Sequence, residues 1–100
     1  MAKTFRPADA FHPGEFLRDE LSARGWTQSD VARIVARPLQ AINELVLGKK
    51  RITAETAKAI GLALGTGPEL WINLQTAYDL FHAPEPSAAI AKRAAEMAKA

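Results

Sequence analysis

The sequence contains no cysteine among its 100 residues, so disulfides, thiol catalysis and cysteine-ligated metal sites are excluded. Its two histidines, His12 and His82, stand at opposite ends of the chain without metal-ligand spacing, and no metal site is expected. Glycine-rich phosphate loops and local Ser/His/Asp sets are also missing. We therefore expect a protein that is not an enzyme and that uses no cofactor, metal or small-molecule substrate.

Long apolar runs and a strong net charge are missing as well. No stretch approaches the roughly 20 apolar residues that span a bilayer, and the opening MAKTFRPADA lacks the apolar core of a signal peptide. The net charge of +2 is too small to indicate nucleic acid by itself. With 48% hydrophobic and 24% charged residues, the chain is suited to one small core. We therefore expect a compact cytoplasmic protein without membrane contact.

The most informative stretch is WTQSDVARIVARPLQAINELVLGKKRIT, residues 26–53. Thr27 is a good N-cap for a first helix of about eight residues, and Ala36 and Arg37 then make a turn. Pro38 fits the first position of a second helix, where its missing N–H costs nothing. Two short helices joined by a tight turn are typical of a helix-turn-helix DNA reader.

The second helix separates core positions from exposed ones. Ile42, Leu45 and Val46 repeat at helical spacing and should face inward. The candidate base-reading residues on the more exposed arcs are Leu39, Gln40, Asn43 and Glu44. The amides of Gln40 and Asn43 can pair with N6 and N7 of adenine, although both could be ordinary surface residues.

The other two candidates suit different contacts. Leu39 can offer only an apolar contact, for example to a thymine methyl group. Glu44 can accept a hydrogen bond from N4 of cytosine. Alternatively, its carboxylate can disfavour binding to other sequences or form an ion pair with a neighbouring arginine. Most of the sequence readout is therefore assigned to the two amide side chains.

Basic residues gather around this pair of helices. From residue 33 to residue 58, six basic residues stand against two acidic ones, a local net charge of +4. The candidate phosphate contacts are Thr27, Gln28, Arg37, Lys49, Lys50 and Arg51. Thr27 and Gln28 begin a helix, where backbone amides can meet a phosphate. For the charges alone, a solvated face is the alternative.

Helical patterns also flank the pair. One helix should open at Pro13 and end near Gly25, a fourth should start at Thr53 and stop at residues 65–67, and a fifth should run from Pro68 to about His82. No stretch alternates with a period of two, so no substantial sheet is expected. The pattern predicts an all-α fold.

The fifth helix carries apolar residues on more than one side. The stripe expected to close the core consists of Leu70, Trp71, Leu74, Ala77, Tyr78 and Phe81. Ile72, Thr76 and Leu80 lie off that stripe and are our candidates for a twofold dimer contact. Such a dimer would place two recognition helices roughly 34 Å apart. The alternative is a helix wrapped on both sides by its own domain and tail.

The composition changes after His82. A proline-containing linker leads to Ser87, which caps the alanine-rich stretch SAAIAKRAAEMAKA. Only Ile90 and Met97 could bury much surface, and an isolated helix of this length is marginal in water. We predict a DNA-binding domain over residues 1–83 and a helical tail over residues 84–100, ordered mainly if it packs on a neighbour.

From about Phe11 to Phe81 the chain resembles the HigA-type antitoxins, a branch of the phage-repressor-like (XRE) helix-turn-helix proteins. The resemblance rests on HPGEFLRDEL at the start, GKKRIT after the second short helix and PELWINLQTAYDL at the end. It implies a five-helix lambda-repressor-like domain that forms a homodimer, binds double-stranded operator DNA and represses its own operon. It also implies a partner, a HigB-like toxin of the RelE type that cleaves mRNA on the ribosome.

Which surface would meet a toxin is not indicated by these motifs. Residues 1–11 and the tail from Pro84 are the candidates, because the DNA-reading core needs neither. The alternative function is a free-standing or phage-derived repressor without a toxin partner.

The chain departs from the commoner family pattern in its turn. Many relatives have glycine at the position of Ala36 and serine at the position of Pro38. Many phage repressors have a polar base-reading residue at the position of Leu39. If Ala36 adopts a positive φ, the expected strain is roughly 1 kcal/mol.

Overall fold

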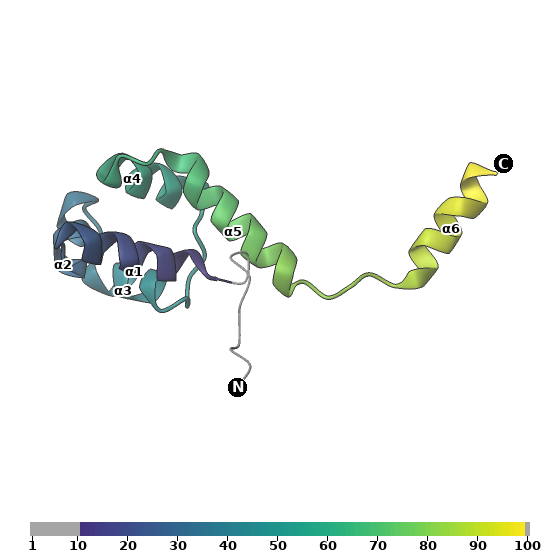
Figure 1. The fold of residues 1–100 in the computed structure, drawn as a ribbon, viewed down its shortest axis with the longest axis horizontal. Coiled ribbons are helices and arrows are strands. Elements are labelled where there is room, and N and C mark those ends of the chain that lie inside the picture. The colour runs from purple at the N-terminus through teal and green to yellow at the C-terminus, as the bar shows by residue number, and fades with distance from the viewer. Residues whose placement is uncertain (1–10, 100) are drawn as a thin grey trace, which may run out of the picture.

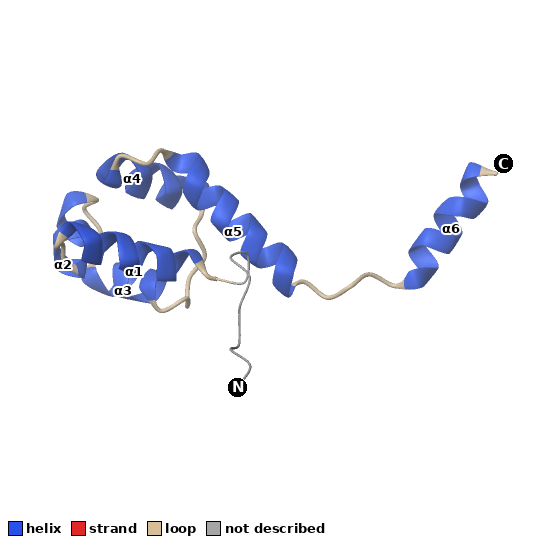
Figure 2. Cartoon of the chain, viewed as in Figure 1, coloured by secondary structure: helices blue, strands red, loops and turns tan. Residues whose placement is uncertain are grey.

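The structure, a computed structural model, describes residues 11–99, and within that range the chain forms six helices and no strand (Figures 1 and 2). The helices are α1 (Pro13–Arg24), α2 (Gln28–Ile34), α3 (Leu39–Val46), α4 (Ala54–Leu64), α5 (Pro68–His82) and α6 (Ala88–Ala98). The predicted all-α fold is confirmed. The division into a domain and a tail stays a prediction, and the first ten residues of the proposed toxin-binding segment lie outside the described range.

Side-chain caps fix the starts of three helices that frame the candidate site. His12 Nδ1 accepts from the N–H of Gly14 at 2.9 Å and so caps α1. The hydroxyl oxygens of Thr27 and Thr53 accept from backbone N–H groups at the third helical positions of α2 and α4. These bonds satisfy amides that have no intrahelical acceptor, which is why the helices begin where the sequence pattern placed them.

Helix α3 begins one residue later than predicted. Pro38 has φ −59° and ψ 145°, so it is the N-cap, and Leu39 is the first helical residue. The carbonyl of Pro38 accepts from the N–H of Ala41 at 3.0 Å and starts the helical ladder. Ala36 has φ 56° and is the single non-glycine residue with a positive φ within residues 11–99. The turn therefore keeps a backbone conformation that favours glycine, although this chain has alanine there.

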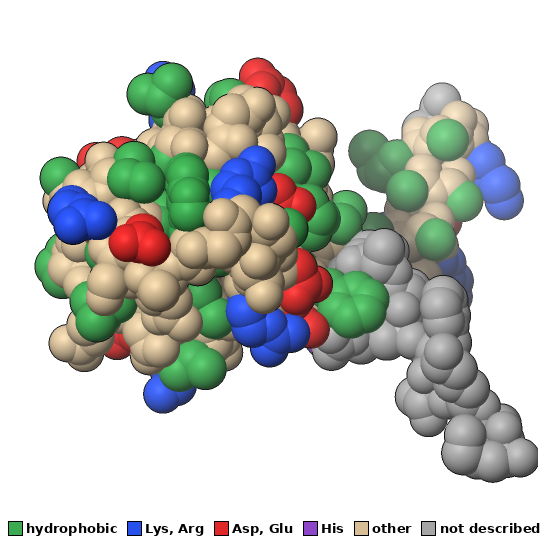
Figure 3. Space-filling model, turned by 60° about the vertical axis from the view of Figure 1, so that its left-hand side comes forward, with side chains coloured by type: hydrophobic (Ala, Val, Ile, Leu, Met, Phe, Trp, Pro, Cys, Tyr) green, Lys and Arg blue, Asp and Glu red, His purple; other side chains and the backbone are tan. Residues whose placement is uncertain are grey.

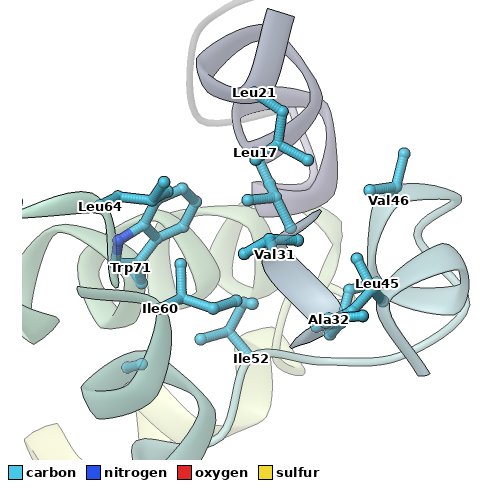
Figure 4. Close-up of a cluster of buried hydrophobic side chains, with 12 residues drawn as sticks. Leu17, Leu21, Val31, Ala32, Leu45, Val46, Ile52, Ile60, Leu64 and Trp71 are labelled. Carbon is cyan, nitrogen blue, oxygen red and sulfur yellow. The ribbon is translucent and has the colours of Figure 1, made fainter. Parts of the chain in front are cut away.

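The core lies where α1, α2, α3, α4 and α5 meet, and Figure 4 shows its side chains converging. Its members are Leu17, Leu21, Val31, Ala32, Ile42, Leu45, Val46, Ile52, Ala57, Ile60, Leu64 and Trp71. Trp71 is fully buried, and its Nε1 donates to Thr66 Oγ1 at 2.8 Å. All three predicted inward positions of α3 belong to this core, so the opposite arc of α3 is left at the surface.

A close backbone contact fixes the C-terminal end of α3. A Cβ added to Gly14 at the start of α1 would lie 2.9 Å from both the carbonyl carbon of Leu45 and the carbonyl oxygen of Val46. Only glycine allows α1 and α3 to approach this closely. The position of α3 is therefore set by backbone contact as well as by side-chain packing.

Two expectations about the C-terminal third are wrong, and one alternative does not hold. Phe81 does not close the core but is 49% exposed, because the last turns of α5 extend past the other helices (Figure 1). Ile72 was placed away from the core, yet it is half-buried and packs against it. The tail does not wrap α5, since α6 contributes no buried residue and lies apart from the bundle. Within residues 11–99, no helix combines the length and the hydropathy needed to cross a membrane.

Candidate nucleic-acid interface

The starts of α2 and α3 border one surface hollow. Its lining consists of Thr27, Gln28, Ser29, Leu39, Gln40 and Asn43. The hollow thus brings together three predicted base readers and two predicted phosphate contacts. Ser29 is a lining residue that the sequence pattern did not single out. The arrangement offers hydroxyl, amide and apolar groups on one concave surface.

Two amide side chains in this hollow are coupled. Asn43 Nδ2 donates to Gln28 Oε1 at 3.2 Å. Each amide carries two donors and an acceptor, so the pair keeps the Asn43 carbonyl oxygen and the Gln28 amino group available. An acceptor beside a donor is the combination that adenine N6 and N7 require. This bond places Gln28, a predicted phosphate contact, beside a predicted base reader.

Glu44 connects a predicted base reader to a predicted phosphate contact. Its carboxylate accepts from Gln40 Nε2 at 3.5 Å and lies 3.4 Å from Lys50 Nζ. The neighbouring cation is therefore a lysine and not the arginine considered from the sequence. These contacts restrain Gln40 and Lys50 relative to each other across the end of α3.

A second hollow lies between α3 and the start of α4. It is lined by Arg37, Ala41, Leu45, Lys50, Arg51, Thr53, Glu55 and Thr56. Three of these residues are predicted phosphate contacts. Ala41 and Leu45 lie on the other side of α3 from Gln40 and Asn43, because helical residues advance by about 100°. The arc of α3 that carries the predicted base readers is thus flanked by polar groups on one side and by cations on the other.

Both arginines among the predicted phosphate contacts already have partners within the protein. Arg37 donates to Thr56 Oγ1 at 2.8 Å and lies 3.9 Å from Glu55. Arg51 donates to Asp79 Oδ2 at 2.8 Å, and this hydrogen bond holds the pKa of Asp79 below its usual range. A phosphate would have to compete with these bonds, and at Lys50 with the ion pair to Glu44, so the exposed Lys49 is the best placed of the basic contacts.

The loop after α3 is tied to α5 by a residue that sequence reasoning missed. Gln75 is 3% exposed, and its Oε1 accepts from the N–H of Ile52 at 2.7 Å. Its Nε2 donates to Asp79 Oδ1 at 3.0 Å, which joins this bond to the ion pair of Arg51. The signal in the sequence is a polar residue one turn after Trp71, inside an otherwise apolar stripe.

His12 links the start of α1 to α5. Besides capping α1, its ring stacks edge-on against Tyr78 with the centroids 5.0 Å apart. Burial lowers the pKa of His12 because it disfavours the charged ring, and the nearby Glu15 partly opposes that shift. A neutral His12 keeps the Nδ1 lone pair that accepts from the helix, so its role is structural.

The charges on the face seen in Figure 3 are mixed. Lysine and arginine side chains are scattered among acidic and hydrophobic ones and do not form a surface of one sign. A partner that binds this face must therefore be recognised by local groups more than by bulk charge.

The predicted dimer residues on α5 differ in exposure. Leu80 is 73% exposed, Thr76 is exposed and Ile72 is half-buried.

Known proteins are similar to most of this chain. Virulence-associated protein I of Dichelobacter nodosus is 40% identical over 72 residues, which cover 71% of this chain and 67% of that protein. An addiction module antidote protein of a HigA family from Coxiella burnetii has TM-score 0.67 and 38% identity, over 71% of this chain and 78% of that one. Pseudomonas aeruginosa antitoxin HigA, solved with the higBA promoter, has TM-score 0.69 and 29% identity, over 88% and 90%. No protein-family model matches the chain.

Proposed function

The chain belongs to the HigA family of XRE-type helix-turn-helix antitoxins, and we propose that it binds operator DNA as a dimer, represses its own operon and neutralises a HigB-like toxin. The relatives are named as a virulence-associated protein, an antidote protein and an antitoxin, and the antitoxin was solved with promoter DNA. The proposal concerns three partners, namely DNA, a second copy of the chain and a toxin.

The observation that carries the DNA part is the exposed arc of α3 between two hollows. In this proposal the arc enters the major groove, where Gln40 and Asn43 read base edges and Leu39 contacts a thymine methyl group. Asn43 and Gln28 act as a hydrogen-bonded unit, which favours adenine. Lys49 and Lys50 contact phosphates on the flank, so that they position the helix without reading sequence.

Salt dependence tests the phosphate contacts. Replacing Lys49 and Lys50 with glutamine should weaken binding to all DNA sequences alike and reduce the salt slope by about 0.9 for each lost contact. The Lys92→Gln/Lys99→Gln variant is the control, because it removes the same two charges from the tail. An unchanged slope in the Lys49→Gln/Lys50→Gln variant would show that these two lysines do not contact DNA.

The dimer is proposed to use the exposed side of α5, with Thr76 and Leu80 at its centre and Ile72 at its margin. Two DNA readers related by a twofold axis suit a palindromic operator whose half-sites lie one helical turn apart. Sedimentation of the free chain measures this association. A chain that remains monomeric both alone and on a palindromic operator would contradict it.

The toxin is proposed from family membership. Residues 1–11 and 84–100 are the candidate contact segments, since the core residues of the described range all lie outside them. Co-expression with the product of the adjacent reading frame tests this part. A stable complex supports an antitoxin, whereas an adjacent product that neither binds nor is toxic would leave a free-standing repressor as the function.

A further inference from the structure

Helix α6 has an apolar stripe that nothing covers. Ile90 is 51% exposed and Met97 76% exposed, and with Ala94 they recur at the three- and four-residue spacing of one helical face. Lys92 and Lys99 point to the opposite face by the same periodicity. The helix is therefore amphipathic without having a surface to pack against in the described chain.

Such a helix needs a partner surface to be stable. With 11 residues it is shorter than the roughly 12–15 residues at which an isolated helix becomes marginal in water. Ser87 caps it, and alanine favours it, but neither replaces packing as the main source of helix stability in proteins.

The linker directs α6 away from its own bundle. Ala83 and Ser87 are extended, with ψ 141° and 137°, and Pro84 and Pro86 fix the φ angles between them. A proline-rich segment of this kind is semi-rigid and spans about 3.1 Å per residue, or roughly 16 Å here. Figure 1 shows α6 held apart from α1–α5 by this segment. A second copy of the chain is therefore better placed than its own bundle to cover α6.

The end of α5 offers the matching uncovered surface. Leu80 is 73% exposed and Phe81 49% exposed, on the part of α5 that projects beyond the other helices. A stable interface buries about 800 Å² per partner and uses some 20–30 residues on each side. The exposed side of α5 supplies only a few of these, whereas adding α6 and its linker supplies more than ten others.

We propose that two copies exchange their tails, so that the Ile90–Met97 stripe of one copy packs on the Leu80–Phe81 end of α5 in the other. This inference rests on the proposed dimer and adds the element that completes it. Because the exchange is reciprocal about a twofold axis, each copy covers both of its exposed apolar surfaces. The tail is then a dimerisation arm and the source of most of the interface area, which leaves residues 1–11 as the candidate toxin contact.

Glutamine substitutions test the arm in the full-length chain. The Ile90→Gln/Met97→Gln variant removes the apolar stripe, and Lys92→Gln/Lys99→Gln makes the same number of changes on the opposite face. Neither pair touches the core, since α6 has no buried residue. In sedimentation equilibrium, the first variant should raise the dimer dissociation constant at least about tenfold and the second less than about twofold. Equal effects, or none, overturn the proposal.

Cross-linking between different chains tests the exchange itself. Because the natural sequence has no cysteine, only the introduced cysteines can react. One chain carries Ala94→Cys and the other His82→Cys, and the mixture is treated with a short bismaleimide. The control mixture replaces His82→Cys with Leu62→Cys, because Leu62 on α4 is 86% exposed. The exchanged arm predicts a higher yield in the first mixture. Equal yields overturn it. A chain that carries both Ala94→Cys and His82→Cys and forms cross-links only within one molecule also overturns it.

Binding to a single operator half-site separates this inference from the proposed function. The Ile90→Gln/Met97→Gln variant should bind a half-site duplex as tightly as the unchanged chain, because one copy suffices there. If the unchanged chain binds neither the half-site nor the full operator, the proposed function fails on its own. If it binds DNA but never dimerises, the tail exchange fails alone.

Discussion

Replacing Ala36 with glycine should stabilise the protein, because Ala36 holds a left-handed backbone conformation with φ 56°. In that conformation the Cβ of an L-residue crowds its own carbonyl, which costs about 1–2 kcal/mol. Glycine has no Cβ and removes this strain. The side chain of Ala36 is exposed, so its loss leaves no cavity, and the bond from its N–H to the carbonyl oxygen of Arg33 at 3.2 Å is kept.

The net effect is smaller than the strain itself. Glycine increases the conformational freedom of the unfolded chain, and this offsets about 0.4–1 kcal/mol of the gain. The Ala36→Gly variant should therefore gain about 0.5–1 kcal/mol in the free energy of unfolding. For a domain of this size, that corresponds to a rise of about 2–8 °C in melting temperature.

Urea unfolding followed by circular dichroism measures this difference. The Ala23→Gly variant is the control, since Ala23 is exposed within α1, where glycine should be destabilising. The two variants should move in opposite directions. If Ala36→Gly is neutral or less stable than the unchanged chain, the strain argument for the turn is refuted.

Three other substitutions follow from the contacts around α3. The Gln75→Leu variant should lose about 1–3 kcal/mol in the free energy of unfolding, because it leaves the buried N–H of Ile52 without an acceptor. The Gly14→Ala variant should lose about 1–3 kcal/mol or more, since the new Cβ meets the backbone of Leu45. Burial lowers the pKa of His12 in the folded state, so the neutral ring stabilises the folded protein. This stabilisation is fully present above pH 6.5 and is lost as the pH falls towards the folded-state pKa. The His12→Asn variant, which keeps a capping acceptor without titrating, should therefore lose less stability between pH 7.5 and pH 5.

Each of these has a direct check by urea unfolding. Asn73→Leu on the exposed side of α5 is the control for Gln75→Leu and should change stability by less than about 0.5 kcal/mol. An equal pH dependence of the His12→Asn variant and the unchanged chain would exclude His12 as the titrating group. A Gly14→Ala variant of normal stability would show that α1 and α3 can separate without strain.

Local sequence signals predicted the positions of the helices well. Thr27 and Thr53 are caps, and residues 65–67 end α4, so these boundaries depend on neighbouring residues alone. The inward positions Ile42, Leu45 and Val46 followed from helical spacing. Pro38 was misplaced by one residue because proline suits both the N-cap and the first helical position, and only its ψ angle decides between them.

Contacts between distant segments could not be predicted in the same way. The bonds of Gln75 to Ile52 and of Arg51 to Asp79 join the loop after α3 to α5, and no local pattern pairs such residues. Phe81 fits the core stripe of α5 by spacing, yet its exposure depends on where the neighbouring helices end. The coupling of a predicted reader to a predicted phosphate contact likewise needed the structure.

The ratio of operator affinity to random-DNA affinity tests the central claim most directly. In the Gln40→Ala/Asn43→Ala variant the ratio should fall by at least about tenfold, because each good bidentate contact to a base contributes about 1–3 kcal/mol of discrimination. In the Lys49→Gln/Lys50→Gln variant both affinities should fall and the ratio should stay the same. A ratio that is unchanged when Gln40 and Asn43 are removed would contradict the assignment of α3 as the helix that reads DNA.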